Sequence, residues 1–130
     1  MRKIVIIDDS KDLLFAMQRL LSFYEFTVRT ATDSKILQYE IESFKPEIVI
    51  IDVLLNGENG REICKILREN PANKEITLIL FSASPKHLKN FEECNADDVI
   101  EKPFGIKELI EKIEFAVKSR KEYLDNINKT

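Results

Sequence analysis

Three short runs of apolar, mostly β-branched residues constrain the fold of this chain most strongly. They are Ile4–Ile7, Ile48–Ile51 and Ile76–Phe81, and each is too short for a helix and almost free of polar residues. Such runs are typical of strands that are buried on both faces. Two weaker runs with strand composition, Phe26–Ala31 and Val99–Ile100, raise the expected number of strands to five.

Apolar residues at three- and four-residue spacing lie between these strands and predict amphipathic helices. The first helix follows Ser10, which suits an N-cap, and the second and third end before Pro46 and Pro71. A poorer helix has only Leu88 and Phe91 as apolar anchors, so we expect it to be the loosest element. The expected helices cover residues 13–24, 36–44, 63–67, 85–93 and 106–117.

The alternation of strands and helices indicates βαβ units and therefore a parallel sheet with helices on both faces. The chain has 130 residues, which is room for one domain. We therefore expect a small, doubly wound α/β domain. It should cover residues 1–120, with residues 121–130 as a helix extension or a tail.

Composition and charge argue against several classes of function. With 44% apolar and 33% charged residues, the chain has the composition of a soluble globular protein. A net charge of −3 without a sustained basic run argues against a nucleic-acid ligand. The N-terminal apolar run is too short for a signal sequence or a membrane span, so we expect a cytoplasmic protein with no membrane partner. Cys64 and Cys94 lack CxxC spacing and are interpreted as ordinary, partly buried thiols.

Polar residues that suit phosphoryl chemistry follow four of the five expected strands. In an open parallel sheet, ligands bind beyond the carboxyl ends of the strands, so these side chains should lie near one another. Converging carboxylates repel each other unless a cation neutralises them, and Mg²⁺ is usually held by a few carboxylates together with water and phosphate oxygens. A lysine and a hydroxyl opposite the metal would stabilise a transferring phosphoryl group. The residues are Asp8 and Asp9 after the first strand, Asp52 after the third, Ser82 after the fourth and Lys102 after the fifth.

Four motifs carry a resemblance to a known family: Ile4–Ser10, Ile48–Gly60, Leu78–Ala83 and Glu101–Phe104. With these motifs in order, residues 3–117 resemble the receiver domain of two-component response regulators, and in size the chain is similar to single-domain, chemotaxis-regulator-like members. The resemblance implies a flavodoxin-like fold with strand order 2-1-3-4-5. It also implies a phosphoryl donor, either a sensor histidine kinase or a histidine phosphotransfer protein, and Mg²⁺ as the cofactor.

The resemblance assigns roles to the acidic residues of the expected site. Asp52 would be the phosphoacceptor. Asp9, Asp52 and the backbone carbonyl of Leu54 would hold Mg²⁺, and Asp8 would act mainly through water. Together these residues would form the metal side of the site.

The resemblance places the phosphoryl contacts and the conformational switch opposite the metal. Lys102 would pair with the acceptor carboxylate and its phosphoryl group, and the bond before Pro103 would be cis, as it is in the family. Ser82 would hydrogen-bond a phosphoryl oxygen. Val99 stands where the family commonly carries a Tyr or Phe that turns inward on phosphorylation, so the aromatic half of the switch is missing. We hypothesise that Ser82 and Ala83 still move toward the phosphoryl group, with a different output surface.

Two further expectations concern the loop after Asp52 and the output surface. Asn56 stands where the family often has a proline, so we expect this loop to be more mobile than usual. The signal should leave by protein contact. By analogy with the fold, the face formed by residues 85–93, 99–100 and 106–117 is the expected surface for a dimer or a partner.

Two other functions remain open beside a phosphorylated receiver, which is not a conventional enzyme because it accepts a phosphoryl group and only slowly hydrolyses it. A degenerate receiver would act as a binding module without phosphorylation. A magnesium phosphatase of the haloacid dehalogenase type would need a second acid two residues after the nucleophile, where this chain has Leu54.

Simple structural roles account for other residues that drew attention. Asp8 and Asp9, taken alone, would be an N-cap and a turn. His87 lies between lysines, which favours a solvated side chain over a ligand. The phenylalanines expected in or near the core are Phe81, Phe91, Phe104 and Phe115.

Overall fold

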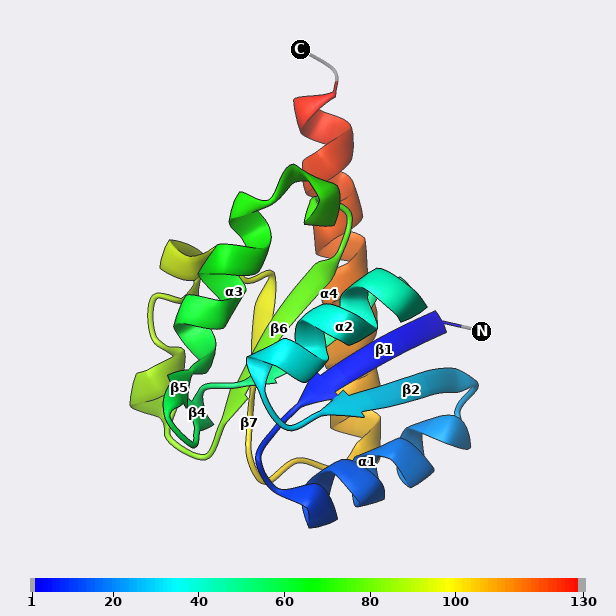
Figure 1. Cartoon of the computed structure of the whole chain (residues 1–130). Helices are drawn as coiled ribbons and strands as arrows, with labels where there is room; N and C mark the ends of the chain where they lie inside the picture. The colour runs from blue at the N-terminus through cyan, green and yellow to red at the C-terminus, as the bar shows by residue number, and fades with distance from the viewer. Residues whose placement is uncertain (1, 129–130) are drawn as a thin grey trace.

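A computed structural model describes residues 2–128 of the chain. Its main sheet has five parallel strands in the order β2-β1-β3-β6-β7 (Figure 1). Because β6 and β7 are the fourth and fifth strands of this sheet along the chain, the order is the expected 2-1-3-4-5, and the flavodoxin-like α/β fold is confirmed. The strands are β1 (Arg2–Ile7), β2 (Phe26–Ala31), β3 (Ile48–Asp52), β6 (Thr77–Ser82) and β7 (Asp98–Glu101).

Helices cover both faces of the sheet because the strand side chains point alternately to the two sides. On one side, Ile4, Ile6 and Phe81 pack with α1 (Lys11–Ser22) and α4 (Ile106–Ile127). On the other side, the intervening strand residues pack with α2 (Ser34–Phe44) and α3 (Gly60–Glu69), and a short 3₁₀ turn, η1 (Pro71–Asn73), follows α3. The two apolar clusters on opposite faces explain why the runs Ile4–Ile7, Ile48–Ile51 and Leu78–Phe81 contain no polar residue.

Side-chain caps begin three of the helices. The Ser10 side chain accepts a hydrogen bond from the amide of Leu13 at the start of α1, as the sequence predicts. Asp33 and Asn59 cap α2 and α3 in the same way. These caps satisfy amides that have no partner within the first turn, so they fix where each helix leaves the edge of the sheet.

The segment expected as the poorer helix is not an α-helix. It forms two 3₁₀ turns, η2 (Pro85–Leu88) and η3 (Phe91–Cys94), separated by Lys89 and Asn90, and the φ of Asn90, 53°, is left-handed. A right-handed helix cannot pass through such a residue, so the expectation was wrong. Cys94 ends η3 and lies buried, as does Cys64 in α3, whereas both were expected to be only partly buried.

Several apolar side chains on the predicted helix faces are exposed. Phe115 in α4 is 64% exposed, which corrects its expected place in the core. Phe91 and Phe104, by contrast, are half-buried and pack against the two core clusters. On each helix, the apolar residues cover a wider part of the surface than the part that contacts the sheet, so some of them remain exposed. The exposed residues are Leu20, Tyr24, Ile36, Tyr39, Ile66 and Phe115.

Helix α4 extends beyond the sheet toward the C-terminus (Figure 1). It remains helical through Ile127, so the described part of residues 121–130 continues the helix, and residues 129–130 lie outside the described part. Arg120 is buried in this helix and donates hydrogen bonds to the carbonyl oxygen of Lys74. Within residues 2–128, no helix is long and apolar enough to cross a membrane.

Candidate functional site

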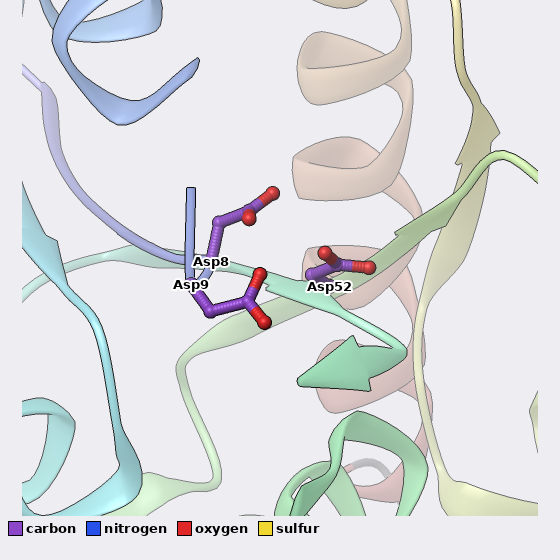
Figure 2. A group of neighbouring side chains, drawn as sticks. All are labelled: Asp8, Asp9 and Asp52. Atoms are coloured by element: carbon purple, nitrogen blue, oxygen red, sulfur yellow. The ribbon is translucent and has the colours of Figure 1, made fainter. Parts of the chain in front are cut away.

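Three aspartates meet at the carboxyl edge of the sheet (Figure 2). Asp52 is the last residue of β3, and Asp8 and Asp9 directly follow β1, the strand that pairs with β3. Each can offer a carboxylate oxygen within 4.8 Å of the other two. Because neighbouring parallel strands end at the same edge, the structure brings together the three carboxylates that the sequence predicts.

The cluster combines two buried carboxylates with a more open one. Asp8 and Asp52 are 1% and 5% exposed, whereas Asp9 is not buried. Burial, and then the negative charge of Asp8, raise the pKa of Asp52 from its ordinary 3.8 to about 6. Lys102 and the amide of Leu54 act in the opposite direction. Asp52 is thus a desolvated carboxylate whose negative charge is incompletely neutralised by the protein.

Lys102 supplies the positive charge opposite the carboxylates. It follows β7, and its Nζ lies 3.1 Å from Asp8 Oδ2 and 3.3 Å from Asp52 Oδ2. The ammonium also lies 4.4 Å from the centre of the Phe81 ring, where it faces the π electrons. The bond to Pro103 is cis, as the family resemblance implies.

The predicted switch residues lie around the end of β6. Ser82 is buried, and its Oγ accepts a hydrogen bond from the amide of Ser84 at 3.1 Å. Ala83 is exposed immediately after it. Val99 in β7 is half-buried and packs against the core cluster on the α3 side of the sheet. The structure therefore brings Ser82 and Ala83 to the same edge of the sheet as the aspartates. Val99 lies instead on the α3 face of the sheet, against the core cluster that includes Leu88 and Cys94 of the η2–η3 segment.

The loop after Asp52 forms a small hairpin that the sequence does not predict. Strands β4 (Leu54–Leu55) and β5 (Glu58–Asn59) pair antiparallel, and Gly57 between them has a φ of 74°, which favours glycine. The amide of Asn56, at the position where the family often has a proline, donates to Asp9 Oδ2 at 3.1 Å. A proline would have no amide hydrogen to give, so this residue type permits a contact with the acidic cluster.

The far side of the hairpin is held by α2 and α3. The Glu58 carboxylate accepts hydrogen bonds from both the amide and the hydroxyl of Ser34 at the start of α2. Gly60 begins α3, and its amide donates to the carbonyl of Val53 at 2.8 Å. A Cβ on Gly60 would overlap the carbonyl oxygen of Asp52, so a side chain is excluded at this position.

The donor set fits a hard divalent cation. All three acidic residues offer carboxylate oxygens, and Asp9 lies on the open side, where a hydrated ion has access. Mg²⁺ prefers such oxygens and keeps several of its waters. Asp9 and Asp52, with Asp8 through water, would hold the ion. The amide of Leu54 donates to Asp52 Oδ1 at 3.1 Å, and the predicted role of the Leu54 carbonyl stays a prediction.

Comparison with known proteins identifies the family of the chain. The response regulator receiver domain family matches residues 4–114. The chain belongs to this family. Among solved structures, a putative response regulator from Chloroflexus aurantiacus superposes on this receiver domain with a TM-score of 0.83 at 24% identity, over 90% of this chain and 98% of that one.

Two further structures show the same fold. The chemotaxis protein CheY4 of Vibrio cholerae has a TM-score of 0.82 at 21% identity and covers 89% of this chain and 98% of its own. The BeF3-activated N-terminal receiver domain of RstA from Klebsiella pneumoniae has a TM-score of 0.80 at 21% identity, with coverages of 89% and 98%. These likenesses extend the confirmed fold over nearly the whole receiver domain.

Sequence reasoning missed how the η2–η3 segment is attached to α3. The guanidinium of Arg61 donates to the backbone carbonyls of His87, Lys89 and Asn90 at 2.9–3.0 Å. No local pattern predicts this contact, because an arginine in the first turn of a helix usually faces solvent. His87 was expected to be solvated but is half-buried, and its Nδ1 is buried without a hydrogen-bond partner among the described residues.

Proposed function

We propose that this receiver domain accepts a phosphoryl group on Asp52 from a phosphohistidine of a sensor kinase or a phosphotransfer protein. The observation that supports this most is the setting of that carboxylate, which is buried beside Asp8 and paired with the Lys102 ammonium. Phosphoryl transfer asks a protein mainly for positioning and for neutralisation of charge. A nucleophilic oxygen, an ammonium and carboxylates that suit Mg²⁺ are all present.

In the proposed step, an Asp52 oxygen bonds to phosphorus as the bond between phosphorus and the donor's histidine nitrogen breaks. The donor imidazole leaves as a neutral ring that keeps the proton already on its other nitrogen. Mg²⁺, when bound, would neutralise charge on the phosphoryl oxygens. Lys102 would keep its pairing with Asp52 and extend it to the phosphoryl group, while Asp8 holds the lysine from the other side at 3.1 Å.

The proposed switch begins at Ser82. Its hydroxyl now accepts from the amide of Ser84, and turning toward a phosphoryl oxygen would release that amide. Residue 84 leads directly into η2, so the release would act on the η2–η3 segment. The RstA receiver domain, which shares this fold, is known in a BeF3-activated form, and this supports an activated state for this fold.

The proposed output is a protein contact in the cytoplasm. The surface formed by η2–η3, β7 and α4 receives the switch movement, so we place the binding of a partner or a second copy there. Phe115 adds an exposed apolar side chain to α4.

Intact mass after incubation with acetyl phosphate tests the acceptor. The wild type should gain one phosphoryl group only when Mg²⁺ is present, and Asp52→Asn should gain none. Asp12→Asn, at an exposed carboxylate in the first turn of α1, is the matched control and should be modified like the wild type. A phosphorylated Asp52→Asn protein would contradict the assignment. A wild type that neither gains mass nor binds Mg²⁺ would favour the phosphorylation-independent binding module instead.

A further inference from the structure

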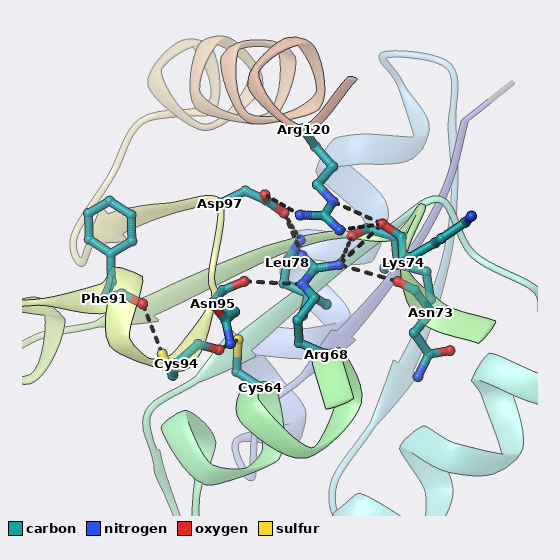
Figure 3. A network of polar contacts seen from close by, with 11 residues as sticks. Cys64, Arg68, Asn73, Lys74, Leu78, Phe91, Cys94, Asn95, Asp97 and Arg120 are labelled. Atoms are coloured by element: carbon teal, nitrogen blue, oxygen red, sulfur yellow. Dashed lines mark hydrogen bonds and ion pairs between the residues drawn. The ribbon is translucent and has the colours of Figure 1, made fainter. Parts of the chain in front are cut away.

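The two cysteines of the chain lie against each other where η3 packs on α3 (Figure 3). The Cys64 thiol donates to the carbonyl oxygen of Cys94 at 3.4 Å, and the Cys94 thiol donates to the carbonyl oxygen of Phe91 at 3.1 Å. The cysteines are 30 residues apart in sequence, so nothing in their spacing reveals this contact. The fold turns two thiols that look unrelated into a pair.

The surroundings of the pair distinguish the two thiols. The adjacent Cys64 thiol, and then the positive charge of Arg61, lower the pKa of Cys94 against the effect of burial. The adjacent Cys94 thiol and burial raise the pKa of Cys64. Cys94 is therefore the thiol that more readily becomes a thiolate, and the thiolate is the reactive form of cysteine. Cys64 lies beside it as a protonated partner.

A small oxidant can reach the pair only when η3 opens. Cys64 is 0% and Cys94 is 4% exposed, so access requires local opening. The η3 turn has four residues, no side-chain cap in the described structure, and left-handed residues on both sides, Asn90 and Asn95. Short uncapped turns are among the first parts of a protein to open. Opening of η3 would expose Cys94 without unfolding the sheet.

We propose that Cys64 and Cys94 form a redox-active dithiol that hydrogen peroxide oxidises to an intramolecular disulfide, which joins α3 to η3. The Cys94 thiolate attacks a peroxide oxygen, the O–O bond breaks, and the released hydroxide takes up a proton and leaves as water. The Cys64 sulfur then attacks the sulfenic acid of Cys94, the S–S bond forms as the S–O bond breaks, and a second water leaves with the Cys64 proton. Two electrons pass from the sulfurs to the peroxide.

The disulfide would tie down the segment that follows the switch residue Ser82. In the thiol form, η3 is held to α3 by packing, by the hydrogen bond from the Cys64 thiol to the Cys94 carbonyl, and by the bond from Arg61 to the Asn90 carbonyl. In the disulfide form, η3 can leave α3 only if a covalent bond breaks. Amide hydrogen exchange over residues 85–95 should therefore slow at least about tenfold on oxidation.

Oxidation of the full reduced chain with hydrogen peroxide tests the proposal. Intact mass should fall by two hydrogen atoms, both thiols should become unavailable to maleimide after denaturation, and non-reducing digestion should give one linked peptide that contains Cys64 and Cys94. Dithiothreitol should reverse all three changes. Cys64→Ser is the matched variant, in which Cys94 should be trapped by dimedone as a sulfenic acid and no linked peptide should form.

The wild-type digest decides the question even where a serine variant fails to fold. Thiols that persist while glutathione in the same tube is oxidised would overturn the proposal, as would a gain of oxygen without loss of hydrogen. A disulfide that joins two chains on a non-reducing gel would also overturn it. Asp52→Asn should form the disulfide like the wild type, so failure of the phosphorylation proposal would leave this result unaffected.

Discussion

The two ends of the sheet both bury charged groups, but they balance the charges in opposite ways. At the carboxyl edge, the described structure places Asp8, Asp9 and Asp52 against Lys102, so negative charge is in excess. At the other end, Asp97 lies between the guanidinium groups of Arg68 and Arg120 (Figure 3). There the positive groups outnumber the acid.

Hydrogen bonding completes the contrast. Asp97 accepts from Arg68 and from the amide of Leu78, each at 2.8 Å. The remaining N–H groups of Arg68 donate to backbone carbonyls, and Arg120 donates to the carbonyl of Lys74. These bonds engage both guanidinium groups with acceptors of the protein itself, so this end acts as a structural clamp. The carboxyl edge keeps acceptor oxygens uncompensated, which costs stability and leaves room for a cation and a phosphoryl group.

The largest expected effect comes from breaking the clamp. Asp97→Ala leaves two buried guanidinium groups without their anion, and removal of one partner from a buried ion pair costs about 3–5 kcal/mol. Urea unfolding should show a loss of this size, while Mg²⁺ affinity of the folded protein stays the same. Asp12→Ala, at an exposed carboxylate, is the control and should change little. A loss below about 1 kcal/mol would contradict the clamp.

A side chain at Gly60 should distort the carboxyl edge. Gly60→Ala forces a Cβ against the Asp52 carbonyl, and overpacking of this kind costs about 1–3 kcal/mol. Because the strain falls on the acceptor residue, Mg²⁺ binding should weaken together with stability. Gly105→Ala is the matched control, since a Cβ there meets open space. Equal effects of the two substitutions would contradict the close approach.

Removing the acceptor charge should stabilise the protein. The pKa of Asp52 is raised to about 6, so its contribution to stability is present below the ordinary value of 3.8 and is lost as the pH rises through about 6. Without Mg²⁺, Asp52→Asn should therefore raise the free energy of unfolding by about 1–2 kcal/mol near pH 7.5, and the gain should vanish below about pH 4. Unfolding curves across this pH range measure it. If Asp52→Asn were less stable than the wild type at pH 7.5, the ionised Asp52 carboxylate would not be destabilising the carboxyl edge of the sheet.

The smallest expected effect concerns the hairpin beside the aspartates. Ser34→Ala removes the hydroxyl bond to Glu58 and keeps the amide bond, which should cost about 0.5–1.5 kcal/mol. Mg²⁺ binding, measured by titration calorimetry, should weaken slightly because the same hairpin carries the Asn56 contact to Asp9. Ser43→Ala, in the same helix, removes only an exposed bond to a carbonyl and serves as the control. An equal loss in both variants would dismiss a special role for Ser34.

The carboxyl edge could be predicted from sequence because its information is local. Each site residue follows a strand that is recognisable by its apolar composition, and parallel strands bring their ends together whatever the details of packing. Asp8 and Asp52 needed only this rule and the family motifs. The cis bond before Pro103 came from the resemblance alone.

The clamp and the cysteine pair could not be predicted in this way. Arg68 and Asp97 are 29 residues apart, and their contact depends on how α3 lies against the loop before β7. The same holds for Arg61. Its partners are backbone carbonyls, which every residue has, so the sequence around them does not indicate the contact. The error over residues 85–93 has a backbone origin, because spacing of apolar residues does not report that Asn90 is left-handed.

The position of Arg120 matters for the design of fusion proteins that contain this receiver domain. The family match ends at residue 114, yet the arginine that closes the clamp lies beyond it. A fusion joined at residue 114 would replace Arg120 with linker and remove the two hydrogen bonds that Arg120 donates to the Lys74 carbonyl. A junction after Ile127 would carry the whole of α4. For domain shuffling, the stretch that must be transplanted is longer than the stretch by which the family is recognised.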